Sequence, residues 1–150
     1  MEFSSLDKLF IEINKEKKEL ISTDEVFELL KSVENLETCR IWLGKDGGPR
    51  PWWHRLLGTR KRFVDSLFAL EWHNQIAILI FHNENWSEYR AIDQEHPVSV
   101  SENDRLEIAQ GEKIAPSNEE CISKQRALAA VYEYLQSGKR PNWLNYNFVE

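Results

Sequence analysis

The feature that most constrains this fold is a pair of strand-like segments, residues 63–72 and 75–81, joined by a short connection at His73 and Asn74. Residues 76–81 (IAILIF) are apolar at every position. A strand without a polar face is normally covered on both sides, so this run predicts a central strand. The short connection predicts that the two strands pair as an antiparallel hairpin.

Other strand signals surround this hairpin. A strand over residues 86–92 extends it to a three-stranded antiparallel meander, and residues 38–43 predict another strand. Residues 44–51 are rich in Gly and Pro, so we expect a loop there. Residues 98–100 and 106–108 are weaker strand candidates between acidic loops.

The N-terminal part predicts a hairpin and a helix. A hairpin over residues 8–21 is expected around a charged turn, with a short helix over 6–13 as the alternative. Ser22 and Glu25 have the spacing of a capping box, and the following apolar residues recur three and four apart. We therefore expect a helix that ends near Asn35.

The C-terminal part predicts a longer helix followed by a strand. Ser117 and Glu120 repeat the capping-box spacing at its start. Gly138 suits a left-handed residue at its end, and Pro141 prevents continuation. Aromatic strand formers follow from Trp143 onward.

These elements predict an α+β fold with a central antiparallel sheet, a meander, and two amphipathic helices on one face. The longer helix lies near the C-terminus and precedes a terminal strand. We expect residues 1–150 to form a single domain. No apolar run approaches the ~20 residues that span a bilayer, and we see no signal peptide. Cys39 and Cys121 are expected to be reduced thiols of a cytoplasmic protein.

The sequence contains no recognisable catalytic or metal-binding motif. His82 and Glu84 form an H-x-E, but a zinc deaminase also needs a downstream P-C-x-x-C, which is absent. No phosphate-binding glycine loop or nucleophile elbow occurs. We therefore expect a protein that is not an enzyme and uses no cofactor, metal ion or small-molecule substrate.

Charge is unevenly distributed along the chain. Residues 83–120 contain ten acidic and three basic residues, whereas residues 45–62 contain six basic residues and one acidic residue. An acidic segment is usually a solvated face, but it can also steer a basic protein partner. The candidate contact residues on this second interpretation are Glu84, Asp93, Glu95, Glu102, Asp104 and Glu107.

The basic segment allows an alternative function. Its aromatic residues are able to stack on bases while its cations bind phosphate, as in single-strand binding sites. The residues concerned are Trp52, Trp53, Arg55, Arg60, Lys61 and Arg62. The chain as a whole is acidic, with a formal net charge of −6, which argues against nucleic acid as the main partner.

The C-terminal sequence resembles one protein family. The helix segment 127–135 (ALAAVYEYL), the segment 138–141 (GKRP), Trp143 and Tyr146 are similar to the end of the type-one immunity proteins of bacterial polymorphic-toxin and contact-dependent growth inhibition systems. That family often has Trp where this chain has Tyr146. The predicted order of elements before this segment is also similar.

The resemblance implies a cytoplasmic antidote that binds the C-terminal toxin domain of a large secreted effector and inhibits it stoichiometrically. Toxins paired with this family are often nucleases or deaminases, and many are basic. We expect a nuclease toxin as the partner and no membrane partner. The shared pattern is structural, so the resemblance assigns no contact residues.

Overall fold

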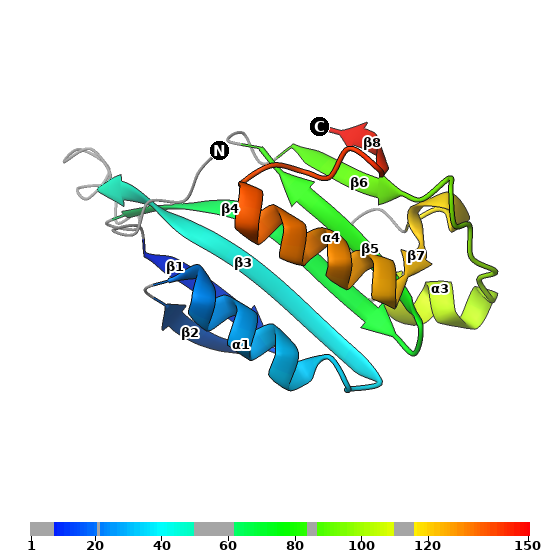
Figure 1. The fold of residues 1–150 in the computed structure, drawn as a ribbon, viewed down its shortest axis with the longest axis horizontal. Coiled ribbons are helices and arrows are strands. Elements are labelled where there is room, and N and C mark those ends of the chain that lie inside the picture. The colour runs from blue at the N-terminus through cyan, green and yellow to red at the C-terminus, as the bar shows by residue number, and fades with distance from the viewer. Residues whose placement is uncertain (1–7, 21, 50–61, 84–86, 110–115) are drawn as a thin grey trace.

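The computed structural model describes residues 8–20, 22–49, 62–83, 87–109 and 116–150. Within these residues, eight strands form one antiparallel sheet and three α-helices pack on it (Figure 1). The strands are β1 (Leu9–Ile13), β2 (Glu16–Leu20), β3 (Thr38–Pro49), β4 (Arg62–His73), β5 (Ile76–His82), β6 (Glu88–Ile92), β7 (Ile122–Ser123) and β8 (Asn145–Val149). The helices are α1 (Thr23–Val33), α3 (Glu102–Ala109), α4 (Lys124–Ser137) and the short 3-10 helix η1 (Asn118–Glu120). The strand order is β2-β1-β3-β4-β5-β6-β8, and β7 pairs with β5. The predicted α+β class is confirmed.

The hairpin of β4 and β5 lies in the interior of the sheet, as the apolar run predicts. Phe68 pairs with Phe81, and the turn between the strands contains Asn74 at a φ of 56° followed by Gln75. The turn therefore lies one residue later than predicted. Both faces of β5 are buried. Ala77, Leu79 and Phe81 contribute to the main core, whereas Ile76, Ile78 and Ile80 contribute to a smaller second cluster.

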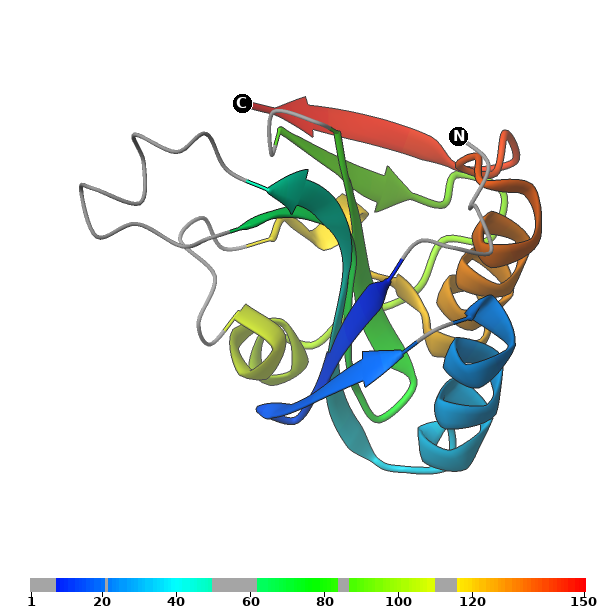
Figure 2. The same ribbon diagram turned by 90° about the vertical axis from the view of Figure 1, so that its left-hand side faces the viewer.

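The helices lie on both faces of the sheet. α1 and α4 lie together on one face, and α3 lies on the opposite face (Figure 2). Val26 and Leu30 of α1 are fully buried in the main core. The ring of Phe27 stacks on that of Tyr132 of α4 with 5.3 Å between centroids. The prediction of two amphipathic helices on one face is confirmed, and α3 is an additional helix.

The start of the C-terminal helix differs from the prediction. Ser117 and Glu120 do form a capping box, but this box caps the start of the 3-10 helix η1. The helix α4 begins later, where the Oγ of Ser123 accepts a hydrogen bond of 3.1 Å from the N–H of Arg126. The reason is β7, which pairs with β5 and holds the chain extended between η1 and α4. The predicted capping box therefore exists, but it belongs to η1, and Ser123 is the cap of α4.

The end of α4 matches the prediction. Gly138 has a φ of 73°, and its N–H donates to the carbonyl of Tyr134 at 2.7 Å. The hydroxyl of Tyr146 donates to the carbonyl of Pro141 at 2.7 Å, which ties β8 to the turn after the helix.

The N-terminal hairpin is also confirmed. β1 and β2 are joined by Asn14 and Lys15, whose φ values are 49° and 73°. Two residues at positive φ are the requirement of a type I′ hairpin turn. Asn14 also accepts a hydrogen bond of 2.9 Å from the backbone N–H of Arg40, which fixes the hairpin against β3.

The loop predicted over residues 44–51 is wrong for residues 44–49, because β3 continues to Pro49. Its pairing with β4 shifts register between Leu43 and Gly44 and again between Asp46 and Gly48. Such irregularities accommodate glycine within a strand instead of ending it.

The weaker strand predictions are also wrong. Residues 98–100 form no regular element, and residues 106–108 lie in α3. The Oγ of Ser101 accepts a hydrogen bond of 3.1 Å from the N–H of Asp104 and so caps this helix. Ile108 is buried against the second cluster. In the part of the chain that the structure describes, no helix is long and apolar enough to span a membrane.

Candidate protein-binding surface

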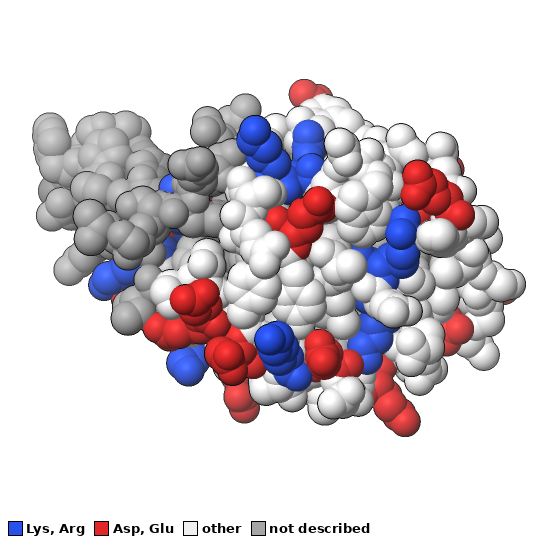
Figure 3. All heavy atoms as spheres, viewed as in Figure 1, with Lys and Arg blue, Asp and Glu red and all other residues white. Residues whose placement is uncertain are grey.

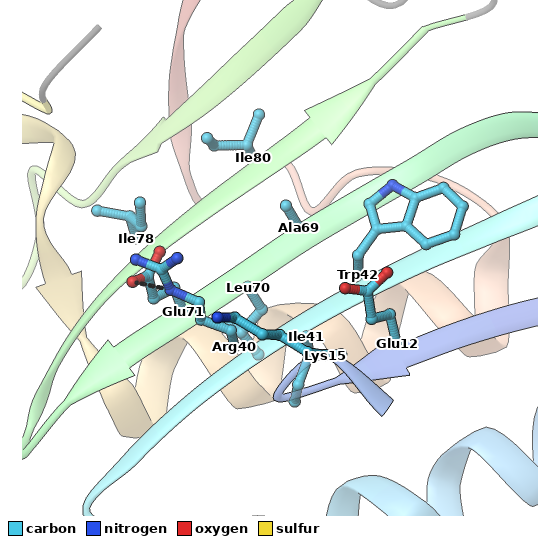
Figure 4. A pocket seen from close by; sticks show the side chains of 10 residues that line it. All are labelled: Glu12, Lys15, Arg40, Ile41, Trp42, Ala69, Leu70, Glu71, Ile78 and Ile80. Atoms are coloured by element: carbon cyan, nitrogen blue, oxygen red, sulfur yellow. Dashed lines mark hydrogen bonds and ion pairs between the residues drawn. The ribbon is translucent and has the colours of Figure 1, made fainter. Parts of the chain in front are cut away.

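A hollow of about 270 Å³ opens on the sheet face opposite α1 and α4 (Figure 4). It crosses β1, β3, β4 and β5, because alternate side chains of each strand point to this face. Its described lining residues are Glu12, Lys15, Arg40, Ile41, Trp42, Ala69, Leu70, Glu71, Ile78 and Ile80. The hollow therefore combines an apolar base with charged groups at its rim.

One end of the hollow contains an ion pair. Arg40 and Glu71 are direct cross-strand partners, and the Nε of Arg40 donates to the Oε1 of Glu71 at 2.7 Å. Only 8% of Glu71 is exposed. This carboxylate is therefore balanced by a charge-assisted hydrogen bond.

The indole of Trp42 forms a wall of the hollow. Its Nε1 donates a hydrogen bond of 2.7 Å to the Oγ of Ser66. The six-membered ring also lies over Gly44, where an added Cβ would be 2.2 Å from the Cη2 of the indole. Trp42 is half-buried on the open face of the sheet. The alternation with the buried Ile41 and Leu43 is the sequence signal that indicates this placement.

Ser66 connects Trp42 to a histidine. A 2.8 Å hydrogen bond joins its Oγ to the Nδ1 of His82. Burial lowers the pKa of His82, and the nearby carboxylate of Glu88 only partly opposes this effect. A serine beside a neutral histidine is also the arrangement of an activated nucleophile. However, only 2% of Ser66 is exposed and its oxygen already accepts from the indole, so this group supports Trp42.

A carboxylate stands next to the indole. Glu12 of β1 is the direct cross-strand partner of Trp42, and both side chains lie at the same end of the hollow (Figure 4). Glu12 is half-buried and makes no hydrogen bond or ion pair within the described part of the chain. The aromatic end of the hollow therefore carries a carboxylate that forms no ion pair within the described residues.

The outer side of α3 lies on the same face of the sheet. At 100° per residue, Glu102, Asn103, Leu106 and Glu107 share one side of this helix, and all four are exposed. Leu106 is 51% exposed. An exposed leucine between two carboxylates is an apolar contact with an acidic rim, which is a common arrangement in protein interfaces.

The other predicted carboxylates have different surroundings. Asp104 points back to the sheet, where its Oδ1 is 3.7 Å from the Nε2 of His73. Glu95 is exposed and lies 3.6 Å from the Nη2 of Arg126. Glu95 is thus accessible, whereas Asp104 is only partly so.

Asp93 does not belong to the accessible surface, because only 4% of it is exposed. Its two oxygens accept from the Nε and Nη2 of Arg126 at 2.6 and 3.0 Å. Its Oδ1 also accepts from the N–H of His96 at 3.2 Å. Burial alone would raise the pKa of Asp93, but these hydrogen bonds outweigh it and lower the pKa. Asp93 is therefore a structural anchor between α4 and the loop after β6.

Several predicted residues lie outside the described residues. They are Glu84 of the acidic set and Trp52, Trp53, Arg55, Arg60 and Lys61 of the basic set. Arg62 is the first residue of β4.

The opposite face of the molecule has no segregated charge. Basic and acidic side chains are interspersed over α1 and α4 (Figure 3). Among the described residues, no three His, Cys, Asp or Glu side chains are grouped to hold a metal ion.

The fold and surface define the chain as an α+β protein whose antiparallel sheet has one helix-covered face and one partly open face. No protein-family model matches its sequence, and no curated protein does either.

Proposed function

We propose that this chain is an immunity protein that binds the toxin domain of a secreted effector and inhibits it stoichiometrically. The toxin is expected to be a basic nuclease, and the inhibition takes place in the cytoplasm. The observation that carries the proposal is the outer side of α3, where Leu106 lies exposed between Glu102 and Glu107.

The position of this surface supports protein binding. α3 projects from the face that α1 and α4 leave open, and Ile108 anchors it from beneath (Figure 2). Its acidic groups would accelerate encounter with a basic partner, while Leu106 supplies an apolar contact after docking. The C-terminal resemblance to type-one immunity proteins gives the class of partner.

The test first identifies a large secreted protein encoded next to this chain and then uses the C-terminal domain of that protein as the toxin domain. Association is measured by surface-based kinetics at low and physiological ionic strength. We expect the variant Glu102→Lys/Glu107→Lys to associate at least about tenfold more slowly at low salt, because steering depends on local charge. Leu106→Ala should mainly raise the dissociation rate.

A matched variant controls for net charge. Glu16 of β2 and Glu28 of α1 are exposed and lie away from α3, so Glu16→Lys/Glu28→Lys changes the formal charge by the same amount. Equal association rates for the two double variants would refute the α3 surface. Absence of any complex with the toxin domain would refute the proposed function itself.

The same samples address the nucleic-acid alternative. A fluorescence titration with labelled single-stranded DNA at low ionic strength would show salt-dependent binding if the basic segment holds phosphates. The inhibitor proposal expects no such binding.

A further inference from the structure

We infer that the hollow beside Trp42 binds a cationic side chain, a guanidinium or an ammonium, presented by a basic protein partner. The identity of this partner as a toxin rests on the proposed function, but the chemistry of the site does not. Three observations lead to this inference: a fixed aromatic wall, a carboxylate that forms no hydrogen bond or ion pair among the described residues, and the placement of the neighbouring cations.

The aromatic wall is organised in advance. The hydrogen bond to Ser66 fixes the direction of the Trp42 indole, and Gly44 provides the space in which the ring lies. A cation is attracted to the face of an indole by the ring quadrupole, and Trp is the best of the aromatic side chains for this contact. No described Lys or Arg side chain occupies the face of Trp42. Four cation–π contacts occur elsewhere among the described residues, including that of Lys124 over Trp72.

The carboxylate of Glu12 complements this wall. It stands beside the indole, it is half-buried, and it forms no hydrogen bond or ion pair within the described residues, although Lys17 is its cross-strand partner on β2. A half-buried carboxylate attracts a cation more strongly than a fully solvated one, because less water screens it. Trp42 and Glu12 together therefore present a π-face and a negative charge to the same small volume.

The two cations that line the hollow do not occupy this end. Arg40 is held by Glu71 at 2.7 Å. Lys15 is exposed in the β1–β2 turn, and its side chain extends toward the Arg40–Glu71 pair, away from Glu12 (Figure 4). The hollow is thus negative and aromatic at one end and positive at the other, which orients a ligand that carries a cation on an apolar stem.

The apolar base suits such a stem. Ala69 lies between the two ends, while Ile78 and Ile80 of β5 line the side of the hollow, Ile78 next to the Arg40–Glu71 pair (Figure 4). The volume of about 270 Å³ is below the range of pockets for drug-sized molecules and fits a single side chain. The methylene stem of Arg or Lys packs on apolar surface while its charged end stays in a polar environment.

The experiment measures by NMR the chemical shift of the indole N–H of Trp42 in the ¹⁵N-labelled chain. The chain has six Trp residues, so the peak is assigned with Trp42→Phe. The probe is N-acetyl-arginine amide, and the uncharged N-acetyl-citrulline amide has nearly the same shape. We expect a saturable shift with the arginine probe and at least fivefold weaker binding of the citrulline probe.

Two charge variants complete the test. Glu12→Gln should weaken binding of the arginine probe at least fivefold. Glu16→Gln removes an exposed carboxylate from the neighbouring strand and should leave binding unchanged. Any of three results would overturn the inference. The two probes bind equally well, or the two variants lose binding equally. The third is that no shift appears up to 50 mM of the arginine probe, which is roughly the weak end of single-contact affinities.

The outcome is separable from that of the proposed function. The NMR titration contains no toxin, so a chain that binds no toxin domain can still show the cation site. Conversely, a chain that inhibits the toxin while failing the titration refutes only the cation site. When both hold, Glu12→Gln should speed dissociation of the toxin complex, whereas Glu16→Gln should not.

Discussion

Ser66 is a small residue with a large structural role. It is buried on the open face of the sheet and contacts both Trp42 and His82. An indole nitrogen only donates, so its hydrogen bond depends on this one hydroxyl. The orientation of the Trp42 indole on the open face is therefore set by Ser66, which is buried.

Replacement of this hydroxyl tests its role. Ser66→Ala should lower the free energy of unfolding by about 1–3 kcal/mol, because it removes the acceptor of the Trp42 indole and the partner of His82. Urea unfolding monitored by circular dichroism measures the change. Ser32→Ala is the matched control, since that hydroxyl is exposed and donates only to Leu29, and its effect should stay within about 0.5 kcal/mol. Equal effects would contradict the role given to Ser66.

At the scale of elements, α4 has the most sharply defined ends. Ser123 caps its start, and Gly138 ends it in the left-handed conformation. Only Gly adopts this conformation without steric cost, while Asn tolerates it better than other residues. After α4 the chain turns at Pro141 and continues into β8.

Substitutions at Gly138 should separate backbone strain from packing. Gly138→Val is expected to lower the free energy of unfolding by more than about 1 kcal/mol, because a β-branched residue is strained at a φ of 73°. Gly138→Asn adds a side chain of similar size and should cost clearly less. Thermal melting followed by circular dichroism compares the two. Equal melting temperatures for the wild type and the Val variant would rule out a strained backbone here.

The elements that sequence predicted well are those with strong local signals. The apolar run 76–81 and Gly138 lead to a central strand and a helix end without knowledge of tertiary contacts. The start of α4 was misplaced because Ser117 has a valid local cap, and only pairing of β7 with β5 shows that the chain is extended after it. α3 was missed because its apolar residues are few and Leu106 faces outward.

The candidate surface was less predictable than the fold. The charge pattern of the sequence predicts Glu102, Glu107 and Asp93 equally as surface residues. Only the tertiary structure distinguishes Asp93, because it pairs with Arg126. Glu12 lies in β1 and Trp42 in β3, and β2 and α1 separate these strands in the sequence. The two residues are neighbours only because of the β1–β3 register. Such cross-strand neighbours have no signature in a single sequence.

The whole molecule should be most stable over a limited pH range. Burial lowers the pKa of His82 below 6.5, so the unfolded state binds this proton more readily and stability falls as the pH drops below 6.5. The pKa of Asp93 is below 3.8 in the folded state, so protonation of this carboxylate at still lower pH reduces the stability further. Burial raises the pKa of Cys39 and Cys121 from 9.0 to about 11, so stability falls again as the pH rises above 9.0.

We therefore expect the urea midpoint to be nearly constant between about pH 7 and 8.5 and to fall on both sides, since linkage acts only where the folded and unfolded pKa values differ. His82→Gln should flatten the decrease between pH 6.5 and 5.5. A wild-type midpoint that does not change over that interval would contradict a neutral, half-buried His82.

The placement of α3 has a consequence for how such a protein diverges. Its outward residues Glu102, Leu106 and Glu107 take no part in either apolar cluster, and Ile108 holds the helix from the other side. Substitutions on the outward side therefore change the chemistry of this surface without altering how the sheet packs. Under the proposed function, a new toxin specificity is thus attainable on α3 without any change in the packing of the strands and α4.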